Sequence, residues 1–141
     1  MMGRKSLITF FFISVILWNT IYFSSFPEVV LLSFDVEPVD GTESILKILD
    51  VLDESGVKAT FFFTGEYVET YPGIVNLTYS RGHEIGCHGY SHRSLPYLSP
   101  EEKIFEVMGC RSSITALTGE APAGFRAPYN RADEEIKDYL W

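Results

Sequence analysis

The three histidines of this 141-residue chain lie within ten residues, in the stretch HEIGCHGYSH that begins at His83. His88 and His92 are four residues apart, and one tight turn can bring such side chains within about 6 Å of each other. Two imidazoles and a carboxylate are a ligand set of catalytic zinc, which keeps one position open for water. The stretch therefore predicts a metal site that uses His88 and His92, whereas we expect His83 only to hydrogen-bond the backbone.

Two carboxylates, Asp35 and Glu37, follow the apolar run VVLLSF. Alternate residues of a strand share a face, so both carboxylates can lie at one rim while Val36 lies in the core. Only one of them is needed as a metal ligand, and the other can act as a general base. Arg126, in the segment FRAPY, offers a fixed cation to a buried carboxylate. Taken alone, either carboxylate could instead cap the next helix, and FRAPY could be a strand that ends in a proline turn.

The elements that must position these residues alternate along the chain. Apolar runs of strand length occupy residues 29–34, 58–65, 83–88 and 123–129, and helical patterns occupy residues 42–55, 71–81, 99–119 and 131–140. Such alternation predicts an α/β fold of β/α units with a parallel sheet, although four strands are too few to close a barrel. The active sites of these folds lie where the strands end, so the carboxylates, the histidines and Arg126 are expected at one rim.

Capping residues mark the ends of the predicted helices. Thr42 is a candidate N-cap for the helix at 42–55, and Gly56 is its predicted stop. Ser99 and Glu102 have the spacing of a capping box, with Pro100 in the first turn. These signals place a well-defined helix directly before FRAPY and another directly after the two carboxylates.

Residues 7–26 form a strongly apolar segment without a charge. Twenty residues in a helix reach about 30 Å, enough to cross the core of a bilayer. Arg4 and Lys5 precede the segment and Glu28 follows it, which predicts a cytoplasmic N-terminus and an exported remainder. We interpret residues 1–26 as a signal anchor, with a cleaved secretory signal or a buried core helix as the alternatives. The domain is then expected at residues 29–141, either anchored to the membrane by the N-terminal helix or secreted.

The predicted exported part carries a large negative charge. The formal net charge is −8, and without Arg4 and Lys5 nine basic residues face nineteen acidic ones, which gives −10. This charge argues against nucleic acid or an anionic polymer as a partner and favours a neutral substrate. Export would permit a disulfide, but Cys87 lies in an apolar strand, which favours a buried free thiol.

Four motifs, in the order SFDVE, ATFFFTG, GHEIGCHGYSH and GFRAPY, resemble those of the polysaccharide deacetylases of the NodB-homology type, carbohydrate esterase family four. The resemblance runs from about Val29 to Trp141, and the motifs together are highly specific. It implies a distorted (β/α) barrel, here partial and preceded by the N-terminal hydrophobic helix. It also implies an enzyme that removes acetyl groups from an N-acetylated carbohydrate polymer or oligomer with a divalent metal, usually zinc.

The resemblance also assigns roles to individual residues. Asp35 resembles the catalytic base of the family, and Arg126 resembles the residue that orients this base. His88 and His92 match the metal-binding histidines. Tyr129 matches the position whose backbone N–H helps to hold the oxyanion, an interaction generally worth about 3 kcal/mol per donor.

The chain departs from the family pattern at two places. The common first motif is TFDDG, whose second Asp binds the metal, and Val36 takes that place here. Some relatives have a carboxylate one position later, and Glu37 resembles that arrangement, so Glu37 is predicted as the third metal ligand. The family's general-acid histidine lies beyond FRAPY, but no histidine follows His92 in this sequence. We therefore expect a C-terminally truncated member with weak or no activity.

Two other functions stay open at this point. A chain that lacks the general acid could be a non-catalytic or vestigial carbohydrate-binding protein. Some members with altered first motifs hydrolyse other amides without this metal, so an amidohydrolase that acts on a small non-sugar amide is the second alternative. Acetate release from N-acetylglucosamine oligomers, and its sensitivity to chelators, would separate the three functions.

Overall fold

Three short parallel strands form the sheet in the computed structural model, which describes residues 29–140. They are β1 (Ser33–Val36), β2 (Thr60–Phe63) and β3 (Glu84–Cys87), in the order β1-β2-β3. Each strand overlaps a segment predicted as a strand, and the predicted parallel pairing is confirmed. The first strand begins later than the predicted start at residue 29. As a result Asp35 lies inside β1, and Glu37 follows its last residue.

The register of the strands separates two kinds of side chain. On one face the strands contribute large buried residues, which are Val36, Phe61, Phe63, Ile85 and Cys87. On the other face Asp35 is aligned with Phe62, and Phe62 is aligned with Gly86. Because side chains of a strand alternate, Val36 is fully buried while its neighbours Asp35 and Glu37 remain partly exposed, as predicted.

Helix α2 (Glu43–Ser55) follows β1 and confirms the first predicted helix. Gly56 ends it with φ 64°, a left-handed conformation that favours glycine, and its N–H bonds the Asp53 carbonyl at 3.1 Å. Thr42 is the N-cap residue, as predicted, but it has helical dihedral angles and its side chain makes no capping hydrogen bond.

Two helices, α3 (Gly65–Thr70) and α4 (Pro72–Ser80), lie between β2 and β3, where the sequence predicted one at 71–81. Tyr71 separates them with non-helical angles, φ −128° and ψ 52°. The following proline disfavours helical geometry in the residue before it, which accounts for the break. Helix α3 was not predicted. It begins at Thr64, whose hydroxyl accepts the Tyr67 N–H at 3.3 Å.

The helix predicted at 99–119 consists of α5 (Pro100–Ile104), a π-helical turn η3 (Phe105–Gly109) and α6 (Cys110–Thr118). The capping box is confirmed, since Ser99 Oγ accepts the Glu102 N–H at 3.3 Å and Glu102 Oε2 accepts the Ser99 N–H at 2.9 Å. The capping box at Ser99 therefore begins a continuous series of α5, η3 and α6. The widened π turn in the middle was not predicted.

The fourth predicted strand, 123–129, is wrong as a strand. The segment makes a single parallel bridge to β3, between Cys87 and Phe125. The Arg126 N–H donates to the Cys87 carbonyl at 2.8 Å, and there the pairing ends. Pro128 has no N–H to donate and begins a short 3-10 turn, η4 (Pro128–Asn130), which turns the chain away from the sheet. The helix predicted from residue 131 is shorter, α7 (Ile136–Tyr139).

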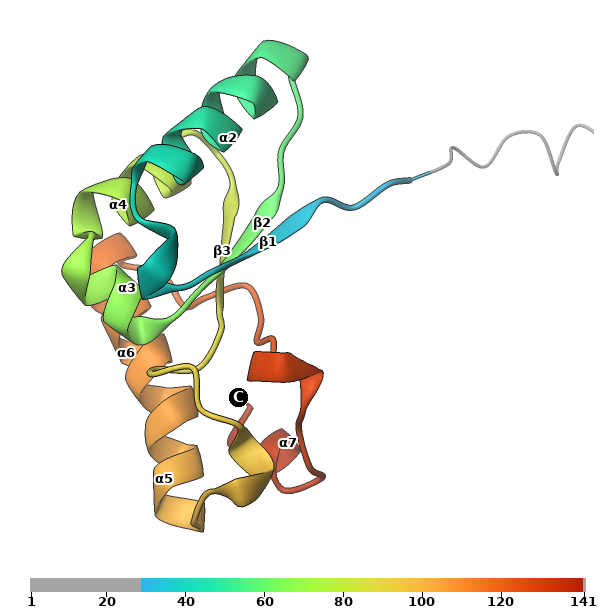
Figure 1. The fold of residues 1–141 in the computed structure, drawn as a ribbon, viewed down its shortest axis with the longest axis vertical. Helices are drawn as coiled ribbons and strands as arrows, with labels where there is room; N and C mark the ends of the chain where they lie inside the picture. The colour runs from blue at the N-terminus through green and yellow to red at the C-terminus, as the bar shows by residue number, and fades with distance from the viewer. Residues whose placement is uncertain (1–28, 141) are drawn as a thin grey trace, which may run out of the picture. The chain divides into compact units, whose positions relative to one another are not determined.

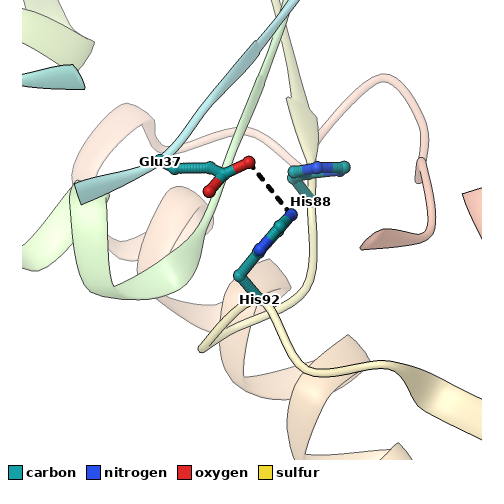
Figure 2. A group of neighbouring side chains, drawn as sticks. All are labelled: Glu37, His88 and His92. Carbon is teal, nitrogen blue, oxygen red and sulfur yellow. Dashed lines mark ion pairs between the residues drawn. The ribbon is translucent and has the colours of Figure 1, made fainter. Parts of the chain in front are cut away.

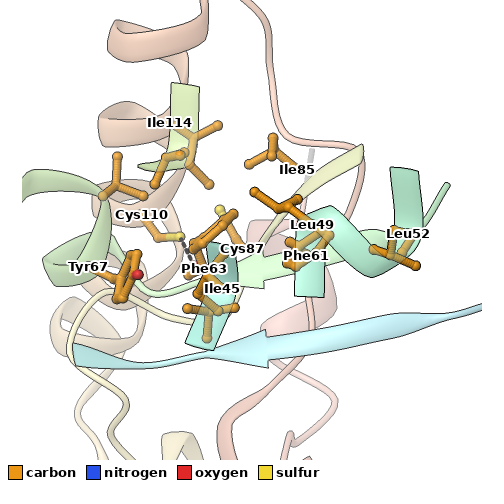
Figure 3. Close-up of a cluster of buried hydrophobic side chains, with 14 residues drawn as sticks. Ile45, Leu49, Leu52, Phe61, Phe63, Tyr67, Ile85, Cys87, Cys110 and Ile114 are labelled. Atoms are coloured by element: carbon orange, nitrogen blue, oxygen red, sulfur yellow. Dashed lines mark hydrogen bonds between the residues drawn. The ribbon is translucent and has the colours of Figure 1, made fainter. Parts of the chain in front are cut away.

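The core lies between the apolar face of the sheet and the helices (Figures 1 and 3). Ile45, Leu49 and Leu52 of α2 are buried, at the three- and four-residue spacing of one helical face. Cys87 and Cys110 are buried and free, and the Cys110 thiol donates to the Phe63 carbonyl at 3.4 Å. The expected free thiol at Cys87 is confirmed. Burial raises the pKa of the Cys110 thiol, so this sulfur stays protonated and unreactive in the folded chain.

An open sheet of three strands is what the described residues contain, which agrees with the predicted α/β class and with part of a barrel. The hydrophobic segment predicted as a membrane helix, residues 1–26, lies outside the described residues. Within residues 29–140, no helix is both long enough and apolar enough to cross a bilayer.

Candidate metal centre

The side chains of Glu37, His88 and His92 meet at the carboxyl ends of β1 and β3 (Figure 2). One potential ligand atom from each residue lies within 4.8 Å of the other two. The closest pair is Glu37 Oε1 and His92 Nε2, at 3.1 Å. These are the three residues that the sequence predicted as metal ligands, and the fold brings them together from two strand ends that are 51 residues apart in the chain.

His88 directly follows β3 and is 3% exposed. Its Nδ1 lies 2.8 Å from the Arg126 carbonyl oxygen. A carbonyl only accepts, so Nδ1 carries the proton and donates, which leaves the Nε2 lone pair free for a metal. Burial lowers the pKa of His88, and the neutral imidazole is the form that binds metals.

His92 is positioned by a strained turn after β3. Its own φ is 58°, and Gly89 at the start of the turn has φ 75°. A positive φ is uncommon for a residue with a side chain and needs support from its surroundings. The His92 ring packs against the Tyr129 ring, with centroids 4.6 Å apart, and against the His88 ring at 5.0 Å. These contacts leave its Nε2 directed at Glu37 (Figure 2).

Glu37 is held by the short 3-10 turn η1 (Pro38–Asp40) that follows β1. The Glu37 N–H donates to Asp40 Oδ2 at 2.7 Å, and the Asp40 N–H donates to the Glu37 carbonyl at 3.0 Å. Both bonds fix the main chain of Glu37 and leave its carboxylate free to face His92. Asp40 was not singled out from the sequence, although its place three residues after Glu37 is typical of such a turn.

Asp35 is paired with Arg126 beside these ligands. Arg126 Nη1 donates to Asp35 Oδ1 at 2.7 Å, and Nη2 donates to Ser33 Oγ at 2.8 Å. The guanidinium also lies over the Phe62 ring, 4.2 Å from its centroid. Phe62 in turn needs the absent side chain at Gly86, where a Cβ would lie 2.5 Å from the ring. The other oxygen, Asp35 Oδ2, lies 4.0 Å from His88 Nε2 and faces the ligands.

Tyr129 lies on the turn that follows the Cys87–Phe125 bridge. It has φ 58° and is 61% exposed, with its ring against His92. The structure thus brings together all six residues that the sequence nominated for the site. His83 does not join them: it precedes β3 at the other end, and its Nδ1 accepts the Ala59 N–H at 3.3 Å, as expected.

Glu106 is a residue that the sequence analysis missed. It lies in the π-helical turn, is fully buried, and accepts hydrogen bonds from Tyr90 and Ser91, which precede His92. A signal did exist, because Glu106 is a charged residue between the apolar Phe105 and Val107 of a helix. The position of a charged residue among apolar ones did not indicate which groups this carboxylate would bind.

The donor set fits zinc. Bonds of about 2.0–2.2 Å from zinc to nitrogen and oxygen place tetrahedral ligands about 3.3–3.6 Å apart. The 3.1 Å between Glu37 Oε1 and His92 Nε2 is close to that spacing, and the three ligand atoms all lie within 4.8 Å of one another. Two imidazoles and a carboxylate would leave zinc one further position for water, and Asp35 Oδ2 lies 4.0 Å from His88 Nε2.

Comparison with known proteins shows similarity to deacetylases of polysaccharides. The family model described as polysaccharide deacetylase matches residues 25–140. A peptidoglycan-N-acetylglucosamine deacetylase of Bacillus cereus is 40% identical over 100 residues, which cover 71% of this chain and 36% of the relative. Chitin deacetylase 1 of Cryptococcus neoformans is 33% identical over 106 residues, which cover 75% of this chain and 22% of the relative.

Solved structures agree with the sequence relatives. The peptidoglycan deacetylase PdaC from Bacillus subtilis superposes with a TM-score of 0.74 and 31% identity. That match covers 78% of this chain and 54% of the solved chain. The chain therefore spans about half the length of this solved relative, and about a third or less of the curated relatives named above.

Proposed function

Because this chain belongs to the polysaccharide deacetylase family, we propose that its strand-end site hydrolyses N-acetyl groups of a carbohydrate polymer or oligomer. The reaction uses a bound divalent metal, for which zinc is our first candidate. The observation that carries the proposal is the meeting of Glu37, His88 and His92 beside the Asp35–Arg126 pair. The two curated relatives are named for peptidoglycan N-acetylglucosamine and for chitin, and N-acetylated sugar polymers are the class they share. A neutral acetamide is also compatible with the net charge of −8.

In this proposal Glu37, His88 and His92 hold the metal, which supplies a Lewis acid and an activated water when bound. Asp35 accepts the proton of the attacking water at Oδ2, since Oδ1 is occupied by Arg126. The water oxygen bonds to the acetamide carbon, and the Tyr129 N–H donates to the resulting oxyanion. The carbon–nitrogen bond then breaks, and protonated Asp35 is the group of this site that can return its proton to the leaving amine.

Arg126 serves this scheme by position and by charge. Its Nη1 donates to Asp35 Oδ1, while Nη2 donates to Ser33 Oγ and the guanidinium lies over the Phe62 ring. The guanidinium is thereby held in place, and Asp35 Oδ2 lies toward the ligands, 4.0 Å from His88 Nε2. Its own carbonyl accepts the His88 N–H and thereby selects the tautomer that binds metal. One residue thus orients the base through its side chain and a ligand through its main chain.

The domain limits and the location are part of the same proposal. We place the catalytic domain at residues 29–141 and the signal anchor, or a cleaved signal, at residues 1–26. The support is the uncharged segment 7–26 with Arg4 and Lys5 before it. A polymer of the cell surface would then be reached outside the cytoplasm.

Acetate release tests the proposed reaction. The full chain is incubated with N-acetylglucosamine oligomers, with zinc and after chelation. We expect zinc-dependent acetate release that Asp35→Asn lowers about 100-fold or more, the usual contribution of a general base. Asp50→Asn is the matched control, because Asp50 pairs with Arg81 on the surface away from the site.

Other outcomes separate the alternative functions. Release that survives chelation would indicate an amidohydrolase that does not use this metal. Zinc and oligomer binding without any acetate release would indicate a carbohydrate-binding protein. Either result would overturn the proposed reaction.

A further inference from the structure

Glu106 is a fully buried carboxylate that none of the proposed chemical steps uses. It lies in η3, the π-helical turn between α5 and α6. Burying a carboxylate is costly unless hydrogen bonds replace its water, so Glu106 needs donors in the folded chain. Single π turns inside helices are frequent at functional sites, because they redirect one side chain out of the regular helical pattern.

All the hydrogen bonds that the structure gives Glu106 come from the turn that carries His92. Oε2 accepts the Tyr90 N–H at 2.8 Å and the Ser91 N–H at 2.9 Å. Oε1 accepts the Ser91 hydroxyl. Both oxygens are therefore engaged by the two residues directly before His92, and a carboxylate can accept all three bonds at once.

The opposite side of the same turn is held by the start of α3. The Gly65 N–H donates to the Gly89 carbonyl at 3.0 Å, and the Glu66 N–H donates to the Tyr90 carbonyl at 3.0 Å. Gly65 allows this approach because a Cβ there would lie 2.3 Å from the Tyr90 ring. The carbonyls of the turn thus bind a helix N-terminus, and its N–H groups bind a buried carboxylate.

We infer that Glu106 is a positioning residue for His92: it locks the turn Gly89–Ser91 so that the strained His92 main chain presents Nε2 to Glu37. The inference rests on the proposed metal centre. His92 has φ 58°, so its conformation must be imposed by neighbouring bonds, and the N–H groups of the two residues directly before it both donate to Glu106. Partners that fix a metal ligand from outside typically change metal affinity by about 10–100-fold when removed.

Zinc affinity of the full chain tests this role, measured by competition with a chromophoric chelator. We expect Glu106→Gln and Ser91→Ala each to raise the zinc dissociation constant about tenfold or more. Ser91→Thr keeps the hydroxyl and should stay near the unmodified chain. Glu101→Gln is the matched control, since it removes the same charge from an exposed position of α5. The visible spectrum of the cobalt-loaded chain should change in the first two variants only.

A merely structural role gives a different result. Glu106→Gln would then lower the thermal unfolding temperature of the metal-free chain, while the zinc affinity and the cobalt spectrum of the folded protein stayed unchanged. If Glu106→Gln does not fold, Ser91→Ala against Ser91→Thr decides the same question.

A chain that binds no metal can be distinguished from a chain in which Glu106 does not position His92. If the unmodified chain binds no zinc, the proposed function is wrong, and the inference is then decided in the metal-free chain. Proton contacts in NMR between the His92 and Tyr129 rings, whose centroids are 4.6 Å apart, should weaken in Ser91→Ala and persist in Ser91→Thr. Contacts that persist in both variants would overturn the positioning role.

Discussion

His83 and His88 lie at opposite ends of the same strand, β3, and each is 3% exposed. Burial lowers the pKa of both imidazoles. The two residues therefore agree in type, depth and protonation, yet only one of them takes part in the candidate metal centre. Neither burial nor a shifted pKa is enough to mark a functional histidine in this chain.

The difference lies in the second ring nitrogen and in the nearby charges. His83 accepts the Ala59 N–H through Nδ1, and its Nε2 has no hydrogen-bond partner among the described residues. The cations Lys58 and Arg81 lower its pKa further, and a metal ion would be repelled by the same charges. His88 donates through Nδ1 and turns Nε2 toward the carboxylate of Asp35, which favours a cation. Surroundings, rather than the histidine itself, make the site.

Replacing each histidine by alanine tests with the largest expected effect whether His88, and not His83, binds the metal. We expect His88→Ala to raise the zinc dissociation constant by more than about 100-fold, because a lost ligand costs more than a lost outer partner. His83→Ala should leave it within about threefold, since a site more than about 7–10 Å away without shared partners usually couples by less than about 0.5 kcal/mol. A chelator competition titration on the full chain measures both, and circular dichroism shows that each variant is folded. Equal losses in the two variants would contradict the assignment of His88 as a ligand.

Acidification tests whether His83 and His88 are both neutral in the folded chain. Both histidines have a folded-state pKa below the unfolded value of about 6.5, so the folded chain binds fewer protons than the unfolded chain. Their contribution to the free energy of unfolding is thus fully present above about pH 6.5 and is lost as the pH falls below it. Urea unfolding of the metal-free chain between pH 7.5 and 5 should show this loss, and His83→Gln should reduce it.

Zinc separates the two histidines in the same experiment. A bound metal and a proton compete for His88 Nε2, so zinc should be released on acidification. His83 should titrate alike with and without zinc. An unfolding free energy that stays constant, or rises, from pH 7.5 to 5 in the metal-free chain would contradict the buried neutral state of both residues.

The sequence predicted well which side chains would meet, because their positions follow from simple periodicity. Asp35 and Glu37 lie two residues apart and Val36 is buried between them, as strand alternation requires. His88 and His92 follow a strand and meet in one turn. Such local rules, together with the rule that active sites lie at strand ends, were sufficient to predict that these four side chains lie near one another, while the roles proposed for them came from the resemblance.

Features that depend on distant partners were not predictable in the same way. The segment at 123–129 has the composition of a strand, but it pairs with β3 at one residue before Pro128 diverts it. Glu106 is explained only by the N–H groups of Tyr90 and Ser91, fifteen or sixteen residues earlier. Its role depends on a π turn, which no capping residue or apolar spacing announces. Sequence patterns therefore found the candidate ligands and missed the residues that hydrogen-bond the turn before His92.

The smallest effect concerns the cations around His83. Lys58→Met keeps the side-chain stem, which lies near Gly82, and removes the charge that lowers the pKa of His83. We expect the pKa of His83 to rise toward its ordinary value, because one of its two repelling cations is gone, while the pKa of His88 stays where it was. Proton NMR titration of the imidazole resonances measures both values in one sample. Lys47→Met is the matched control, since Lys47 pairs with Glu43 on the exposed side of α2. If the pKa of His83 does not change, the charge of Lys58 does not lower it. The two ends of β3 would then differ mainly in hydrogen bonding and not in charge.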